Sequence, residues 1–286
     1  MEQVKWEFSE EELNLSDFAL FLSVMKNQKA HENVLSIIMD ETDLRLRKIH
    51  VEEVVLNRQG HRAIRLDAWA EDEKNRQFST EMQNDTSSDD VRRRARFYQG
   101  LLDTPLLKSG KKTRYRQLPS TVVTFITQED IFERDLARYT FSEQCEEIPE
   151  LRLGDGTRKI FLNMESLNGR AELVSLLQYM KKTSLDNPAI QVMDPRIVEL
   201  DEIVQEVKES EEWEEVRMSI LSIGLERGME QEKKKSILAL LEEFGTPSRE
   251  LRDIICSQKD QEILEKWLKT AAKAGSMEEF RSMAGI

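Results

Sequence analysis

The chain has 286 residues, of which 39% are hydrophobic and 34% charged, a balance that excludes a disordered polypeptide and predicts one main domain with an appendage. No apolar run is long enough to cross a membrane, and the acidic first residues lack the pattern of a signal peptide, so we expect a cytoplasmic protein with no membrane partner. The net charge of −13 argues against a whole surface that binds nucleic acid, and Cys145 and Cys256 lack the spacing of a disulfide framework or a thiolate zinc site.

Hydrophobic periodicity predicts an α/β fold in the first two thirds of the chain. Helices are expected at residues 15–25, 31–39, 91–102 and 171–182. Strands are expected at residues 48–56, 64–70, 78–83, 121–127, 137–142 and 158–162. The first three strands follow one another across short polar connections, including a turn at residues 57–60, and we therefore expect an antiparallel meander within a mixed sheet.

The character of the sequence changes at Pro195. A long charged helix is predicted over residues 196–227, ending near Gly224 and Gly228. Three shorter helices are predicted at residues 231–244, 248–257 and 260–272. We divide the chain into a domain of residues 1–194 and an all-helical C-terminal extension of residues 195–286, and we expect these helices to form the interface of any homodimer.

Two adjacent predicted strands each contain one acidic residue, Asp67 and Glu81. A carboxylate within a strand is costly to bury unless a cation compensates it, and Mg²⁺ is the hard cation that oxygen ligands favour, with Mn²⁺ as a substitute. The backbone carbonyl of Met82 is a candidate third ligand, and Gln83 projects to the same face as Glu81. The alternative is that both acids lie on an exposed strand face.

Basic residues follow directly after these strands. Between residues 84 and 119, nine Lys or Arg outnumber four acids. Arg94 and Tyr98 are one helical turn apart, so both can reach a phosphate beside the metal. The candidate DNA phosphate-binding residues are Arg93, Arg94, Arg96, Tyr98 and Gln99. A solvated charged helix face is the alternative.

These residues carry a resemblance. The sequence resembles the PD-(D/E)xK nuclease family transposases, the Rpn-type recombination-promoting nucleases of bacteria. The signature is carried by Asp67, the Glu81-x-Gln83 pair and the run from Arg94 to Gln99. In this family Glu-x-Gln replaces the more usual Glu-x-Lys. Residues 17–27 and 145–162 resemble further family segments, so the resemblance covers about residues 12–215.

The resemblance implies a restriction-endonuclease-like mixed sheet with flanking helices, and magnesium-dependent endonuclease cleavage of DNA in recombination or transposition. It also implies that Asp67, Glu81 and Gln83 are catalytic and that Asp17 is an accessory acid. From the residues alone, Asp17 fits a helix cap better than a metal ligand.

Two hypotheses follow from the sequence. The first is a metal-dependent DNA endonuclease, favoured because both acidic positions are retained. The second is a catalytically weak or inactive DNA-binding or regulatory protein that keeps the nuclease fold, because the neutral amide of Gln83 can orient groups but cannot supply the charge of a lysine. Under the first hypothesis, we expect cleavage either to be slower or to take its positive charge from Arg94.

Overall fold

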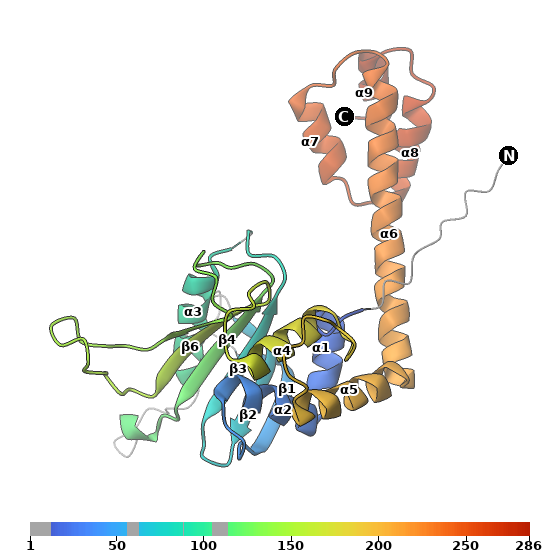
Figure 1. The fold of residues 1–286 in the computed structure, drawn as a ribbon. Coiled ribbons are helices and arrows are strands. Elements are labelled where there is room, and N and C mark those ends of the chain that lie inside the picture. The colour runs from blue at the N-terminus through green and yellow to red at the C-terminus, as the bar shows by residue number, and fades with distance from the viewer. Residues whose placement is uncertain (1–12, 56–62, 88, 105–113) are drawn as a thin grey trace. The chain divides into compact units, whose positions relative to one another are not determined.

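The chain folds into two compact units, residues Met1–Ser210 and Glu211–Ile286. The computed structural model describes residues 13–55, 63–87, 89–104 and 114–286 (Figure 1). Helix α5 (Pro195–Lys208), which we assigned from sequence to the C-terminal extension, packs against α2 (Gln28–Met39) in the first unit. The first unit therefore continues beyond the boundary drawn from the sequence.

The first unit contains the six predicted strands and the predicted helices. In chain order its elements are α1 (Phe18–Met25), α2, β1 (Leu46–Val55), β2 (Ile64–Asp72), β3 (Gln77–Gln83), α3 (Val91–Asp103), the 3₁₀ helix η1 (Tyr115–Gln117), β4 (Thr121–Thr127), β5 (Arg138–Phe141), β6 (Thr157–Asn163), α4 (Ala171–Lys181) and α5. The predicted turn at residues 57–60 and the predicted end of the first strand at Leu56 lie outside the described residues.

The strands form one mixed sheet in the order β1-β2-β3-β4-β6-β5. Strands β1, β2 and β3 pair antiparallel, which confirms the predicted meander. Strand β4 is parallel to both β3 and β6, and β5 pairs antiparallel with β6 at the edge. The predicted α/β fold with a mixed sheet is thus confirmed.

Both faces of this sheet are covered. Helix α3 packs on one face, where the rings of Tyr98 and Phe125 lie 5.8 Å apart, and α1, α2, α4 and α5 lie together on the other side (Figure 1). Strand β4 is accordingly buried along its whole length, as expected for a parallel strand covered on both faces. Polar residues of β3 that face α3, such as Glu81, are therefore enclosed between sheet and helix.

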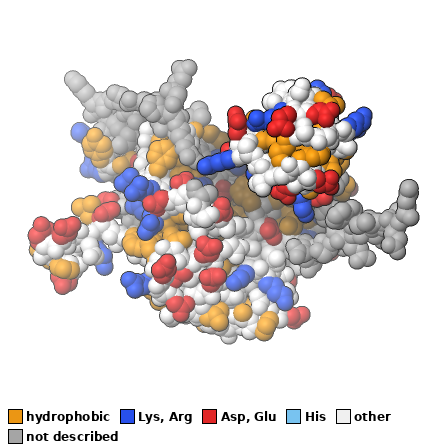
Figure 2. Space-filling view, turned by 90° about the horizontal axis from the view of Figure 1, so that it is seen from above, with side chains coloured by type: hydrophobic (Ala, Val, Ile, Leu, Met, Phe, Trp, Pro, Cys, Tyr) orange, Lys and Arg blue, Asp and Glu red, His pale blue; other side chains and the backbone are white. Residues whose placement is uncertain are grey.

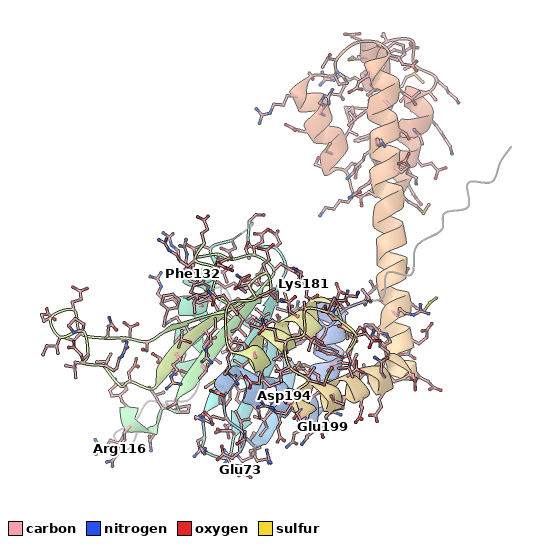
Figure 3. The ribbon with its side chains drawn as sticks, viewed as in Figure 1. Glu73, Arg116, Phe132, Lys181, Asp194 and Glu199 are labelled. Atoms are coloured by element: carbon pink, nitrogen blue, oxygen red, sulfur yellow. The ribbon has the colours of Figure 1, made fainter. Side chains whose placement is uncertain are left out.

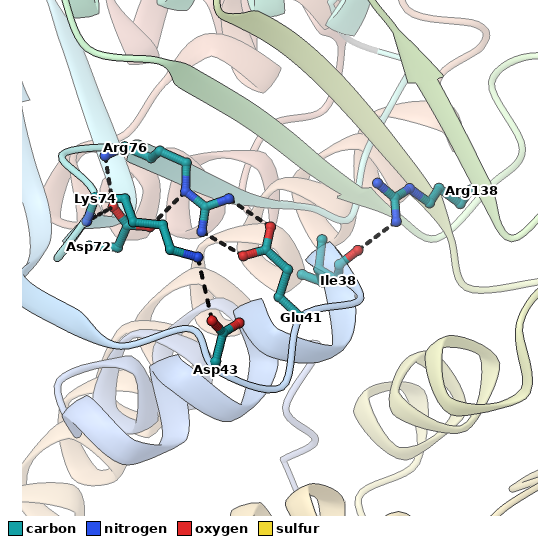
Figure 4. A network of polar contacts seen from close by, with 7 residues as sticks. All are labelled: Ile38, Glu41, Asp43, Asp72, Lys74, Arg76 and Arg138. Carbon is teal, nitrogen blue, oxygen red and sulfur yellow. Dashed lines mark hydrogen bonds and ion pairs between the residues drawn. The ribbon is translucent and has the colours of Figure 1, made fainter.

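Arginines distant in the sequence donate hydrogen bonds to backbone carbonyls at the C-terminus of α2. Arg138 Nη1 donates to the carbonyl of Ile38 at 2.6 Å (Figure 4). Arg170 donates to the carbonyl of Ile37. Cations at a helix C-terminus satisfy its last carbonyls and stabilise the helix dipole. The end of α2 is therefore held by groups on β5 and just before α4.

An ion-pair network connects the β2–β3 turn to the segment after α2. Arg76 contacts both oxygens of Glu41 at 2.6 Å and donates through Nε to Asp72 at 2.7 Å, and Lys74 lies 3.5 Å from Asp43 (Figure 4). Bidentate pairing of this kind fixes the geometry of the guanidinium. The network anchors the hairpin that carries the two candidate acids.

The second unit consists of α6 (Glu211–Glu242), α7 (Arg249–Ser257), α8 (Gln261–Ala271) and α9 (Met277–Ala284). Its core includes Leu241, Leu264, Trp267 and Phe280. The prediction of one helix over residues 196–227 is wrong at both ends of α6: the chain breaks between α5 and α6, and α6 then continues through Gly224 and Gly228 into the separate helix predicted at residues 231–244. A glycine costs a helix only about 1 kcal/mol relative to alanine and ends it only where the backbone turns left-handed. Helix α9 was not predicted.

Candidate active site

Asp67 on β2 and Glu81 on β3 lie side by side, as the hairpin predicts. They lie directly beyond Ala68 and Thr80, the last pair that the two strands form. The N–H of Asp67 donates to Glu81 Oε1 at 3.3 Å, and the N–H of Met82 donates to Asp67 Oδ2 at 3.0 Å. The two acids are only 6% and 0% exposed, so they do not lie on an exposed strand face.

The two oxygens of Glu81 have different surroundings. Oε1 accepts a hydrogen bond from Ser79 Oγ at 2.7 Å in addition to the backbone of Asp67. Oε2 is buried and accepts no hydrogen bond from any residue that the structure describes, and Arg94 Nη2 lies 3.8 Å from it. A buried carboxylate oxygen without a hydrogen bond is costly, and a cation would remove that cost.

The environment of the pair favours protonation. Burial raises the pKa of the Asp67 carboxyl, and the N–H of Met82 opposes that rise. Burial also raises the pKa of Glu81, and the charge of Asp67 adds to the rise, whereas Ser79 and Arg94 oppose it. Two neighbouring carboxyl groups with raised pKa values are a common feature of catalytic and metal-binding sites.

The structure brings the other two predicted residues of β3 to the same place. In an extended strand, the N–H and C=O of one residue leave on the same edge, so the carbonyl of Met82 leaves β3 on the edge where its N–H contacts Asp67. The side chain of Gln83 lies on the face of Glu81, where its Oε1 accepts from Arg94 Nη1 at 2.6 Å. Its amide nitrogen donates to the carbonyl of Asp85.

Arg94 and Tyr98 share one face of α3, as predicted. Arg94 donates to the Tyr98 hydroxyl through Nε at 3.1 Å and through Nη2 at 2.8 Å. The guanidinium carbon lies 5.1 Å from the ring centre of Tyr98 and 5.5 Å from that of Phe125. The arginine is therefore held on two aromatic faces next to Glu81.

The remaining predicted site residues do not join this group. Arg93 and Arg96 are exposed on α3, and Arg93 pairs with Asp90, which caps the helix. Gln99 is 6% exposed and donates to Thr121 Oγ1, at the start of β4. Asp17 occupies the N-cap position of α1, where it accepts from the N–H of Asn14 at 2.6 Å and makes no side-chain cap bond.

The basic segment before β4 lies at the other end of the sheet. Arg114 and Arg116 flank Tyr115, which is 85% exposed, in and beside η1 (Figure 3). The start of β4 pairs with Gln77 at the start of β3, whereas Glu81 lies near the end of β3. Lys108, Lys111 and Lys112, also counted in the basic segment, lie outside the described residues.

The carboxylate pair fits a magnesium ion better than zinc. Within the described ranges, no third His, Cys, Asp or Glu joins the pair to form a larger cluster. Mg²⁺ is commonly held by one or two carboxylates and keeps several waters, whereas zinc takes four nitrogen or sulfur ligands. Asp67, Glu81 and the Met82 carbonyl are the residues that would hold it, and the unbonded Glu81 Oε2 is the observation that supports this fit.

Two residues of the site were missed in the sequence. Ser79 donates to Glu81, and Arg65 accepts from the Tyr98 hydroxyl through its backbone carbonyl at 3.5 Å. Ser79 precedes Glu81 by two residues in a strand, and this spacing, which places the two side chains on the same face, was the signal that could have identified it. Arg65 contributes a backbone carbonyl, for which the sequence holds no such signal.

Comparisons with known proteins add no relative: no family model, no curated protein and no solved structure matches this chain. None of the helices in the described part of the chain is both long and apolar enough to span a bilayer. The site must therefore be interpreted from its own geometry.

Proposed function

We propose that this protein is a magnesium-dependent endodeoxyribonuclease with a restriction-endonuclease-like core of the PD-(D/E)xK class, acting in recombination or transposition. The observation that carries the proposal is the opposed pair of buried carboxylates, Asp67 and Glu81, in which Glu81 Oε2 has no hydrogen-bond partner among the described residues. Such a pair is unfavourable for folding alone and becomes favourable when it binds a divalent cation.

The chain supplies a positive charge although the lysine position holds Gln83. A bound magnesium ion would withdraw charge from the phosphate and acidify a water molecule. Gln83 holds Arg94 by a 2.6 Å hydrogen bond, and Tyr98 fixes the same guanidinium from the other side. The amide thus positions a cation, and the guanidinium would stabilise the charge that develops on the phosphate.

The charge distribution supports access of DNA over α3. Arg92, Arg93 and Arg96 are exposed on that helix. Residues 143–153 form a ribbon, joined by the bridge between Gln144 and Arg152, whose exposed acids include Glu143, Glu146, Glu147 and Glu150. This ribbon is the mainly acidic group at the left edge of Figure 2. A phosphate backbone would be repelled there and attracted to α3.

A second candidate is a DNA-binding or regulatory protein that keeps the fold without efficient cleavage. The observation in its favour is the neutral Gln83, whose two amide atoms are already bonded to Asp85 and Arg94. It would bind DNA through the same exposed arginines and would cut slowly or not at all.

Cleavage of supercoiled plasmid distinguishes the two candidates. The wild type should nick or linearise plasmid with Mg²⁺ or Mn²⁺ and not with EDTA, and Asp67→Asn and Glu81→Gln should abolish cutting. Asp43→Asn is the matched control, because Asp43 is 76% exposed and pairs with Lys74 outside the site. Folded wild type that binds DNA and does not cut it would favour the second candidate.

A Gln83→Leu variant tests the positioning of Arg94. It removes the amide that holds the guanidinium and leaves both acids in place, so cutting should slow by about 10²-fold, the usual cost of losing an electrostatic contact to the transition state. Gln83→Lys supplies the charge directly and should retain activity. Equal rates in all three proteins would refute the assigned role.

A further inference from the structure

Glu81 and Arg94 form an ion pair whose geometry is unusual for a structural contact. The guanidinium lies 3.8 Å from Glu81 Oε2, too far for a hydrogen bond, although both groups are largely enclosed and Arg94 is only 25% exposed. The nitrogens of Arg94 that make short contacts donate to neutral groups instead, namely Gln83 and Tyr98. Glu81 is therefore attracted to Arg94 without being its hydrogen-bond partner.

The same oxygen is the one available to a metal. Oε1 of Glu81 is already occupied by Ser79 Oγ and the N–H of Asp67. A hard divalent cation binds carboxylate oxygens at about 2.1 Å, so a cation on Oε2 would lie within a few ångströms of the guanidinium. Two positive groups so close repel each other, and the arginine and the metal therefore compete for Glu81.

Arg94 need not leave the site when a metal binds. Its bonds to Gln83 Oε1 and the Tyr98 hydroxyl, and its contacts with the rings of Tyr98 and Phe125, do not involve the acids. Only its attraction to Glu81 and to the nearby Asp67 is lost. A guanidinium that loses its anionic neighbour and stays at the surface of α3 gains affinity for another anion, the DNA phosphate.

We propose that Arg94 is a charge gate that couples metal binding to DNA binding at this site. The arginine neutralises Glu81 until a magnesium ion takes over that role, and it then binds the phosphate. The inference rests on the proposed function, because it assumes that Asp67 and Glu81 bind the metal. By linkage, the metal strengthens DNA binding and DNA strengthens metal binding by the same factor.

Calorimetric binding of Mg²⁺ without DNA, at pH 8, tests the competition. Arg94→Gln and Arg94→Met remove the charge and should bind Mg²⁺ about tenfold more tightly than wild type. This factor is the one expected when the repulsion between a divalent and a monovalent cation a few ångströms apart is removed from a hydrated site. Arg94→Lys keeps the charge and should bind as wild type does. Arg93→Gln is the matched control, since Arg93 is 81% exposed on the same helix and pairs with Asp90, and its affinity should stay within about twofold.

Fluorescence anisotropy with a cleavage-resistant phosphorothioate duplex, in EDTA and in Mg²⁺, tests the coupling. Wild type and Arg93→Gln should bind the duplex more tightly in Mg²⁺, and Arg94→Gln and Arg94→Met should lose most of that gain. Circular dichroism confirms folding of each variant, and either neutral variant is sufficient for the test.

Two outcomes separate the gate from the proposed function. If wild type binds Mg²⁺, Asp67→Asn does not, and the neutral Arg94 variants bind it no more tightly than wild type, the gate is refuted and the nuclease proposal stands. If folded wild type binds no Mg²⁺, the metal site itself is refuted, and the gate falls with it.

Discussion

Replacement of Glu81 by glutamine should stabilise the protein at neutral pH when divalent cations are removed. Glu81 is fully buried, and burial together with the charge of Asp67 raises the pKa of its carboxyl. The folded state therefore disfavours the ionised form that the unfolded chain adopts at pH 7. Glutamine keeps an acceptor for Ser79 Oγ and the N–H of Asp67 and loses only the attraction to Arg94 at 3.8 Å.

The size and the pH dependence of the gain follow from linkage. Because the folded pKa of Glu81 is raised, its unfavourable contribution is absent below the unfolded pKa of about 4.3, grows as the pH rises from there to the folded pKa, and is constant above it. At about 1.4 kcal/mol per unit, the rise of the Glu81 pKa to about 8 corresponds to about 5 kcal/mol at pH 8. The amide N–H that glutamine buries without a partner offsets part of this, so we expect Glu81→Gln to gain about 2 kcal/mol. For a unit of this size the melting temperature should rise by about 4–8 °C.

Thermal unfolding in EDTA at pH 5 and pH 8 measures this effect. Asp72→Asn is the control, because Asp72 on the same hairpin is 1% exposed and accepts from the backbone of Lys74 and Arg76 at 2.9 and 2.8 Å and from Arg76 Nε at 2.7 Å. This satisfied carboxylate should destabilise the protein when it is neutralised. A Glu81→Gln variant that melts at or below the wild-type temperature at pH 8 would refute the reasoning, as would a gain that is equally large at pH 5.

Three further predictions concern the stability contributed by residues outside the candidate site. Arg76→Gln should cost about 2 kcal/mol in urea denaturation at pH 7, because it breaks the partly buried contacts with Glu41 and Asp72. Since Arg76 lowers the pKa of Glu41, the deficit should shrink as the pH falls below about 4, and a constant deficit would contradict the role of the ion pair. Burial lowers the pKa of His31 to about 4, so the free energy of unfolding should fall by about 2 kcal/mol between pH 7 and pH 5, as the unfolded chain takes up a proton. His31→Leu should flatten this pH profile. Parallel profiles of wild type and variant would exclude His31 as the cause. Phe280 is fully buried, so Phe280→Ala should destabilise the C-terminal unit by about 3–5 kcal/mol. In hydrogen exchange, the amides of β4 in the first unit should keep their protection. Loss of protection in both units would show that they unfold together.

The meander and the carboxylate pair were predictable because each depends on local rules. Each of two neighbouring strands carries one acid, and a short polar connection makes the strands antiparallel. Asp67 and Glu81 then lie just beyond the last paired residues, Ala68 and Thr80, and contact each other's strand. The cap of α3 at Asp90 and the alignment of Arg94 with Tyr98 likewise follow from spacing within one element. Strand and helix periodicity were sufficient for these features.

Other features depend on contacts between distant segments. The burial of Gln99 against Thr121 follows from the way α3 lies on β4, which no spacing within the helix shows. The contact between Gln83 and Arg94 joins a strand end to a separate helix, and the continuity of α6 through Gly224 depends on how little one glycine costs a long helix. Sequence patterns indicate which groups are available, and packing decides which of them meet.

The arginines at the end of α2 have a consequence for protein synthesis. The two acids, Gln83, Arg94 and Tyr98 all belong to the first 98 residues, whereas the carbonyls of Ile37 and Ile38 accept hydrogen bonds from Arg170 and Arg138. The backbone of Ser16 likewise donates to the carbonyl of Met180. A nascent chain that has released only the site residues from the ribosome therefore lacks the partners of its first helices. Asp67, Glu81 and Arg94 leave the ribosome early in synthesis. The helices that support their sheet can complete their hydrogen bonds only when the segment around residue 180 is also free to fold.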